Sequence, residues 1–144
     1  MKVEAFTDGA CRGNPGPGGW GCVIKMHDKT IKLHGFESST TNNRMELQAA
    51  ISALEYLHAV DEFAVTTDSQ YLRLGITQWI HQWMKNNWRA STGRPVKNID
   101  LWQKLWSLVE HKTIHWYWVK GHSGNPNNEL ADQLANLAID EQPL

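Results

Sequence analysis

The 144-residue sequence predicts an α/β fold in which a mixed β-sheet is covered by helices. Three observations support this fold class. Short apolar segments of strand length alternate with segments whose apolar residues recur at helical spacing. A glycine- and proline-rich turn and a short polar link join the first three strand segments, which are therefore expected to pair antiparallel. Each later strand follows a helix and is free to pair in parallel, so the sheet is mixed.

The first part of the sequence predicts three strands. The first covers residues 3–7, and the turn at residues 13–18 separates it from the second, at residues 19–26. The third covers residues 30–36, and residues 27–29 between them are short and polar enough for a hairpin turn.

A long helix is predicted next, from about residue 43 to residue 58. Its evidence is a row of leucine and isoleucine at helical spacing, formed by Leu47, Ile51, Leu54 and Leu57. The polar residues at its start are candidate N-caps, namely Thr41, Asn42 and Asn43.

The middle of the chain predicts a short strand at residues 64–67, followed by helices at residues 69–74 and 77–84. Asn98 is expected to cap the next helix. The apolar stripe of that helix is Leu101, Leu105 and Leu108.

The last two elements are a strand at residues 114–119 and a helix that begins at Asn125-Pro126. Proline suits the first helical position, because the amide that it lacks would have no partner there. The leucines expected to be buried on this helix are Leu130, Leu134 and Leu137.

Length and composition fit one domain spanning residues 1–144. The apolar fraction of 41% is ordinary for a globular protein, and no apolar run reaches membrane-spanning length. The amino terminus lacks the layout of a secretion signal, so we expect a cytoplasmic protein. Cys11 and Cys22 lie close together in sequence, and we expect both thiols to be reduced.

The charge distribution is uneven although the net charge is only −1. Residues 69–99 contain no Asp or Glu. The basic residues of this stretch are Arg73, Lys85, Arg89, Arg94 and Lys97. A basic patch beside an acidic site suits a polyanionic substrate, and a solvated helical face is the alternative that charge alone leaves open.

Four carboxylates occupy positions where a metal site is expected. Asp8 and Asp68 each end a predicted strand, at the edge of an α/β sheet where ligands bind. Glu46 lies in the first turn of its predicted helix, and Asp132 lies on the last helix, three residues after Glu129. An all-oxygen ligand set favours magnesium or manganese, and such a group supports two-metal hydrolysis of a phosphodiester.

Each acid also has an ordinary explanation when it is taken alone. Asp8 could belong to a turn, and Glu46 could be favoured by the helix dipole. Asp68 could contribute to a helix cap, and Asp132 could be a solvated helical residue. The surrounding motifs weaken these alternatives when they are considered together.

Six motifs follow one another over nearly the whole chain, namely FTDGACRGNPGPGGWG, TTNNRMELQAAISAL, TTDSQY, GITQWI, RPVKNIDLW and WVKGHSGNPNNELADQLA. In sequence, order and spacing they closely resemble bacterial type I ribonuclease H. The resemblance implies a ribonuclease H-like fold, a five-stranded mixed sheet in the order 3-2-1-4-5 with helices on both faces. It also implies an endonuclease that cuts the RNA strand of RNA–DNA hybrids and leaves 3′-hydroxyl and 5′-phosphate ends.

The resemblance further implies roles for individual residues. The catalytic, metal-binding carboxylates would be Asp8, Glu46, Asp68 and Asp132, with Mg²⁺ as cofactor and Mn²⁺ as a substitute. His122 would assist proton transfer or product release, with a plain surface histidine as the alternative. Glu129 would support the site from nearby.

Substrate contacts are implied in the same way. The residues expected to meet the RNA strand are Cys11, Gly13, Asn14, Asn42, Asn43 and Gln70. Those expected to hold a phosphate of the DNA strand are Thr41 and Asn98. The acid-free stretch matches the basic protrusion called the handle, whose expected contacts are Trp79, Lys85, Trp88 and Arg89. Core packing is the alternative for Trp79, and helix capping is the alternative for the asparagine pair.

We therefore expect a monomeric, magnesium-dependent nuclease whose partner is an RNA–DNA hybrid. Two other functions remain open, a non-catalytic hybrid-binding module and a recombination or integration nuclease of the same fold. The handle is less lysine-rich than in many relatives, which predicts weaker hybrid binding. The chain also ends soon after its last helix, where many relatives have a longer tail, and lower stability is expected from this.

Overall fold

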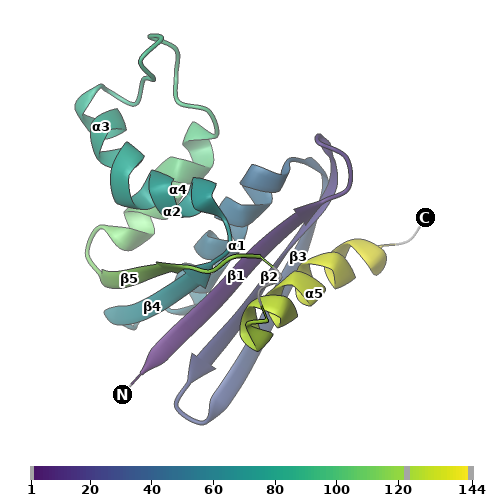
Figure 1. Ribbon diagram of the computed structural model, residues 1–144. Helices are drawn as coiled ribbons and strands as arrows, with labels where there is room; N and C mark the ends of the chain where they lie inside the picture. Colours follow the sequence, from purple (N-terminus) through teal and green to yellow (C-terminus); the bar gives the residue numbers. More distant parts are fainter. Residues whose placement is uncertain (1, 122–123, 143–144) are drawn as a thin grey trace.

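The computed structural model describes residues 2–121 and 124–142 (Figure 1). A five-stranded sheet in the order β3-β2-β1-β4-β5 forms its centre. The strands are β1 (Val3–Cys11), β2 (Gly16–Met26), β3 (Lys29–Thr40), β4 (Glu62–Thr67) and β5 (Thr113–Trp118). The predicted strand order is confirmed.

The sheet is mixed, as predicted. Strand β2 pairs antiparallel with β1 and β3, whereas β4 pairs in parallel with β1 and β5. In the parallel pair of β1 and β4, Thr7 lies opposite Thr67. The residues that follow them therefore lie side by side, Asp8 still within β1 and Asp68 just after the end of β4.

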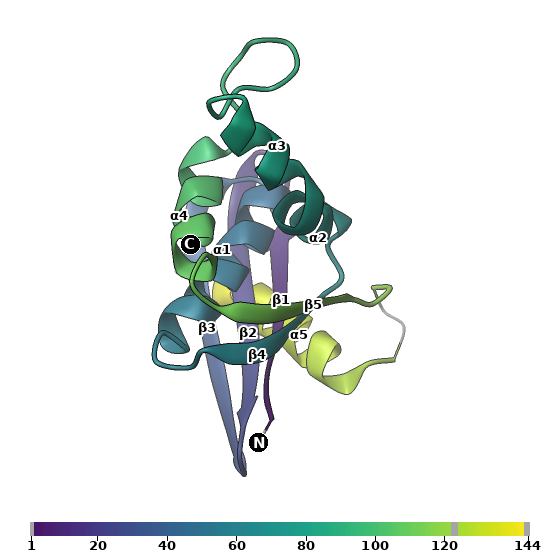
Figure 2. The same ribbon diagram turned by 90° about the vertical axis from the view of Figure 1, so that its left-hand side faces the viewer.

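Helices cover both faces of the sheet (Figures 1 and 2). The helical elements are α1 (Asn42–Tyr56), α2 (Gln70–Leu74), the π-helix η1 (Gly75–Trp79), α3 (Ile80–Lys85), α4 (Ile99–Val109) and α5 (Pro126–Asp140). Helices α1 and α4 pack on the face to which Val3 and Ala5 point. Helix α5 packs on the opposite face, against Phe6 and Val23.

The prediction that Leu137 is buried is wrong, because this side chain is 45% exposed. The buried face of α5 consists instead of Ala131, Leu134, Ala135, Ala138 and Ile139. Strand β2 presents glycine to this helix, and a Cβ at Gly19 would lie 2.2 Å from the Ala135 carbonyl oxygen. The close approach of the helix backbone to a glycine strand selects alanine for the contact and turns Leu137 outward.

Several boundaries also differ from the prediction, since β2 begins at Gly16 inside the predicted turn and β3 runs to Thr40 instead of residue 36. Strand β1 continues to Cys11, because residues 8–11 pair with glycine-rich β2. The helix predicted at residues 77–84 begins instead with the π-turn of η1, where Gly75 lies against the Trp102 ring. A Cβ at Gly75 would be 2.0 Å from that ring, so only glycine allows the contact.

In the described ranges, 2–121 and 124–142, no helix combines the length and the apolar character needed to cross a membrane.

Candidate metal centre and adjoining surfaces

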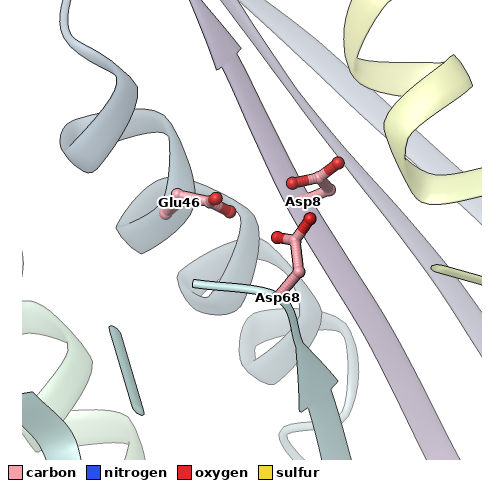
Figure 3. Close-up of side chains that lie close together, drawn as sticks. All are labelled: Asp8, Glu46 and Asp68. Atoms are coloured by element: carbon pink, nitrogen blue, oxygen red, sulfur yellow. The ribbon is translucent and has the colours of Figure 1, made fainter. Parts of the chain in front are cut away.

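Asp68 follows the end of β4, whereas Asp8 lies within the parallel neighbour β1, so the prediction that Asp8 ends the first strand is wrong (Figure 3). The Gly9 amide donates to Asp8 Oδ1 at 2.9 Å. The Trp118 indole donates to the main-chain oxygen of Asp68 at 2.9 Å, which ties the end of β4 to β5. A Cβ at Gly121 would lie 3.1 Å from Asp68 Oδ2, so the lack of a side chain lets the backbone at Gly121 lie close to the carboxylate.

Glu46 reaches the same place from helix α1, because Gly9 lets that helix pack directly on β1. A Cβ at Gly9 would lie 2.5 Å from the backbone nitrogen of Glu46 and from the backbone carbon of Met45. The helix begins at Asn42, so Glu46 is past the first turn, and its predicted first-turn position is wrong. Stabilisation by the helix dipole falls off within the first turn and does not explain this glutamate.

Three carboxylates converge at this edge of the sheet. One oxygen from each of Asp8, Glu46 and Asp68 lies within 4.8 Å of the others. Asp8 is 3% exposed and Glu46 is 5% exposed. Glu46 Oε1 is fully buried and has no hydrogen-bond partner within the described part of the chain. A buried carboxylate oxygen without a donor fits coordination of a cation.

The electrostatics of the cluster are unfavourable without a cation. Burial, followed by the charges of Glu46 and Asp68, raises the pKa of Asp8 far above its ordinary value. Burial and then the charge of Asp68 raise the pKa of Glu46 well above its ordinary value. Two buried acids whose pKa values are both raised indicate a site that protons or divalent cations neutralise.

Asp132 faces the cluster from helix α5. It shares with the other three acids an open hollow of about 400 Å³ and forms a hydrogen bond that further raises the Asp8 pKa. The described residues that line this hollow are Asp8, Gly9, Asn42, Asn43, Glu46, Asp68, Ser69, Gln70, Tyr71 and Asp132. Asp132 is half-buried and lies outside the tight group of three, while Glu129 is half-buried outside the lining.

A second hollow of about 300 Å³ adjoins the first. Its described lining is Asn14, Thr41, Asn42, Asn43, Lys97 and Asn98. Both hollows include Asn42 and Asn43, so they meet at the start of α1. Five of these six residues are predicted substrate contacts, and the structure brings them together from three separate segments.

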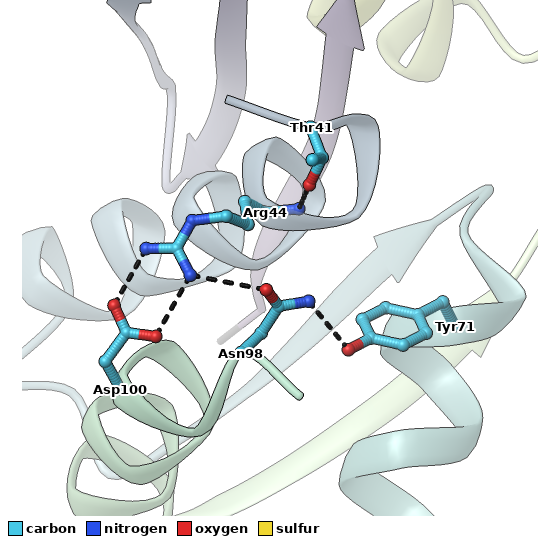
Figure 4. A network of polar contacts seen from close by, with 5 residues as sticks. All are labelled: Thr41, Arg44, Tyr71, Asn98 and Asp100. Atoms are coloured by element: carbon cyan, nitrogen blue, oxygen red, sulfur yellow. Dashed lines mark hydrogen bonds and ion pairs between the residues drawn. The ribbon is translucent and has the colours of Figure 1, made fainter. Parts of the chain in front are cut away.

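The predicted cap at Asn98 is correct in position and wrong in mechanism. Asn98 precedes α4 with a left-handed φ of 60°, and its side chain forms no cap bond. Its amide instead accepts from Arg44 at 3.3 Å and donates to the Tyr71 hydroxyl at 3.1 Å (Figure 4). Thr41 does cap α1, and its hydroxyl accepts from the Arg44 amide at 3.2 Å.

The turn after β1 is ordered by its own contacts. The Cys11 thiol donates to the carbonyl of Gly13 at 2.7 Å and lies near the carbonyls of Gly16 and Thr40. Asn14 Oδ1 accepts from the Asn42 amide at 3.2 Å, which joins this turn to α1. Cys11 and Gly13 line neither hollow, so the structure does not bring them to the acids.

The handle side chains are partly packed and partly exposed. Trp79 is 37% exposed and packs edge-on against Tyr71, so neither core packing nor solvent contact describes it alone. Lys85 and Arg89 are exposed, whereas Trp88 is half-buried against the main core. A third hollow lies between η1 and the segment after α3, and both Trp79 and Arg89 line it.

Two predicted site residues, Gln70 and His122, and two that were not predicted complete the comparison. Gln70 lines the carboxylate hollow, but its Oε1 accepts from Arg73 at 2.8 Å. His122 lies outside the described residues. Sequence reasoning missed Tyr71 and Lys97, although each directly follows or precedes a predicted site residue, Gln70 or Asn98.

Comparison with known proteins agrees with this geometry. Residues 1–140 match the family model for RNase H. A ribonuclease H of Methylococcus capsulatus is 55% identical over 139 residues, covering 96% of this chain and 90% of the relative. A ribonuclease H of Alcanivorax borkumensis is 57% identical over 140 residues, covering 97% of this chain and 93% of the relative.

Solved structures give the same result. The crystal structure of LC9-RNase H1, a type 1 RNase H with the type 2 active-site motif, superposes with a TM-score of 0.88 at 32% identity. It covers 98% of this chain and 73% of that chain. LC11-RNase H1, solved in complex with an RNA/DNA hybrid, superposes with a TM-score of 0.69 at 28% identity. The superposition covers 96% of this chain and 97% of the LC11-RNase H1 chain.

Proposed function

The chain belongs to the ribonuclease H family, and on this basis we propose that it is an endonuclease that hydrolyses the RNA strand of RNA–DNA hybrids. The observation that carries the proposal is the convergence of Asp8, Glu46 and Asp68 within 4.8 Å, with Asp132 facing the same hollow. A protein that only bound hybrids would gain nothing from burying mutually repelling acids. The hollow is open, so a backbone phosphate has access to the carboxylates.

We propose Mg²⁺ as the cofactor, with Mn²⁺ as a substitute, held by Asp8, Glu46, Asp68 and Asp132. All four side chains offer oxygen, the donor that hard divalent cations prefer. Divalent ions held there would supply activation of the attacking water and charge stabilisation at the leaving oxygen, which yields a 5′-phosphate and a 3′-hydroxyl.

The protein's own groups fix where this happens. Gly9 brings Glu46 against β1, and Trp118 holds the Asp68 backbone, so the carboxylates are oriented before substrate arrives. Glu129 stands one turn from Asp132 on α5 and is proposed to support it. His122 is proposed to move protons or to assist product release.

We propose that the hybrid lies across both hollows. Asn42, Asn43 and Gln70 face the carboxylate hollow, where amides and exposed backbone groups meet the 2′-hydroxyls of the RNA strand. Thr41 and Asn98 line the second hollow and are suited to a DNA-strand phosphate.

The turn and the handle complete the proposed interface. Cys11, Gly13 and Asn14 would shape the turn beside the RNA strand, while Lys85 and Arg89 extend the basic surface.

The enzyme is proposed to act as a monomer, in the cytoplasm, with residues 1–144 as one domain. The five described strands form a single sheet, and both cysteines are free thiols.

A direct assay tests the function. Labelled RNA–DNA hybrid, double-stranded RNA and double-stranded DNA are each incubated with and without Mg²⁺, using Asp8→Asn as the matched inactive variant. The proposal requires metal-dependent cleavage of the RNA strand of the hybrid alone. Equal cutting of all three substrates would favour a nuclease of another branch of this fold, and binding without cleavage would favour a binding module.

A further inference from the structure

The second hollow is lined by Asn14 and by two walls that lead into different helices. Thr41, Asn42 and Asn43 come from the start of α1, and Lys97 and Asn98 come from the segment that enters α4. A ligand held between the two walls is positioned only if their separation is fixed. The residues that join the walls therefore matter as much as those that line them.

Arg44 joins the two walls (Figure 4). Its backbone amide donates to the Thr41 hydroxyl on the α1 side. Its guanidinium donates to both oxygens of Asp100, at 3.0 and 2.7 Å, and to Asn98 Oδ1 at 3.3 Å on the α4 side. A two-bonded guanidinium–carboxylate pair fixes direction as well as distance.

The same contact fixes the Asn98 amide. Its oxygen accepts from Arg44, and its nitrogen donates to the Tyr71 hydroxyl at 3.1 Å. That hydroxyl also accepts from the Trp102 indole at 3.0 Å, and Tyr71 lines the carboxylate hollow. The network therefore runs from the second hollow to the first. It also holds Asn98 in a left-handed conformation that costs energy for a residue with a Cβ.

We propose that Arg44 is a positioning residue for the hybrid, an inference that rests on the proposed function. Through Thr41 and Asn98 it sets the place of the DNA-strand phosphate relative to the carboxylates, and so the register of the scissile phosphate. Arg44 is not itself the phosphate ligand, because it is absent from the described lining of the hollow and its charge is paired with Asp100.

Two substitutions distinguish a positioning role of Arg44 from direct attraction of the phosphate, because the two roles predict opposite changes of KM in Asp100→Asn. Arg44→Gln removes both contacts to the α4 side, and Asp100→Asn removes the ion pair that aims the guanidinium, so both are expected to raise KM for the hybrid about tenfold. In both, kcat is also expected to fall, because the scissile phosphate is held out of register with the carboxylates. If Arg44 attracted phosphate directly, Asp100→Asn would free its charge and lower KM instead.

The chain offers a matched control in a second ion pair between the same helices. Lys104 of α4 lies 3.3 Å from Glu55 of α1, away from both hollows. Lys104→Gln removes the same charge from the same helix pair, and it is expected to leave KM unchanged. An equal rise of KM in this control would show that α1–α4 pairing in general, not Arg44, is responsible.

A substrate modification gives a readout that a loss of stability would not change. Neutral methylphosphonates are placed singly along the DNA strand, and the position that most reduces wild-type cleavage marks the held phosphate. Arg44→Gln is expected to lose most of that sensitivity, whereas a merely destabilised enzyme would keep it. Asp100→Asn serves as the second variant if Arg44→Gln does not fold.

The possible failures can be told apart. A wild-type enzyme that leaves the hybrid intact overturns the proposed function and this inference with it. A wild-type enzyme that cuts, combined with an unchanged KM in Arg44→Gln or a lowered KM in Asp100→Asn, overturns only the role of Arg44.

Discussion

Replacing Asp8 with asparagine should abolish metal-dependent cleavage and yet make the metal-free protein less sensitive to rising pH. The substitution keeps the size of the side chain and an oxygen that can accept from the Gly9 amide, a contact of 2.9 Å in the wild type. It removes the ionisable group whose pKa is raised by burial and by the charges of Glu46 and Asp68. The main change is therefore electrostatic.

The direction in which stability changes with pH follows from proton binding to Asp8. In the unfolded chain Asp8 loses its proton near the ordinary pKa of about 4. In the folded chain the raised pKa keeps the proton bound, so the folded state binds more protons. The stabilisation is fully present below pH 4 and is lost as pH rises through the folded pKa, at about 1.4 kcal/mol per pH unit for one proton.

The assay is urea denaturation of wild type and Asp8→Asn in EDTA at pH 5, 6, 7 and 8. Between pH 5 and 7 the wild type should lose about 3 kcal/mol more than the variant. Mg²⁺ should flatten the wild-type profile, because a bound cation replaces the proton and stabilises the folded state. Parallel profiles in EDTA would refute the electrostatic reasoning, and a large loss of stability in the variant at every pH would indicate a structural role for Asp8.

Three other predictions test the supporting contacts. Lys112 donates to the carbonyls of His58 and Val60 at 2.9 and 2.6 Å, so Lys112→Met should lower the free energy of unfolding by about 1–3 kcal/mol, measured by urea denaturation. Gly9→Ala places a Cβ against the backbone of α1 and should cost about 1–3 kcal/mol while also reducing kcat. Lys85→Gln should reduce the slope of log Kd for the hybrid against log salt by about 1 if Lys85 contacts a phosphate; an unchanged slope would remove it from the interface.

The sequence allowed the acidic site to be predicted because the relevant positions depend on local rules. Parallel pairing of β1 and β4 brings Asp8, which lies within β1, beside Asp68, which follows β4. The leucine row of α1 is buried as its spacing predicts. The leucine row needs only periodicity, whereas the strand order was expected from the family resemblance.

Other features depend on how two backbones meet and were not predictable. Leu137 has the spacing of a buried leucine, but the glycines of β2 admit α5 so closely that alanines fill the contact. Asp100 lies 56 positions from Arg44, and no local pattern indicates that their side chains meet. The left-handed Asn98 likewise has no local signal beyond its residue type.

The position of both hollows on one helix explains why α1 determines the geometry of the proposed reaction. Thr41 caps α1 and lines the second hollow, whereas Glu46, five residues later, lines the first. A helix rises about 1.5 Å per residue, so the two positions are roughly 7 Å apart along a rigid axis. The α1 wall is therefore fixed relative to Glu46, whereas the α4 wall belongs to a separate helix. Because Arg44 ties that wall to α1, a small change at Arg44 or Asp100 alters substrate register while the carboxylate cluster stays intact.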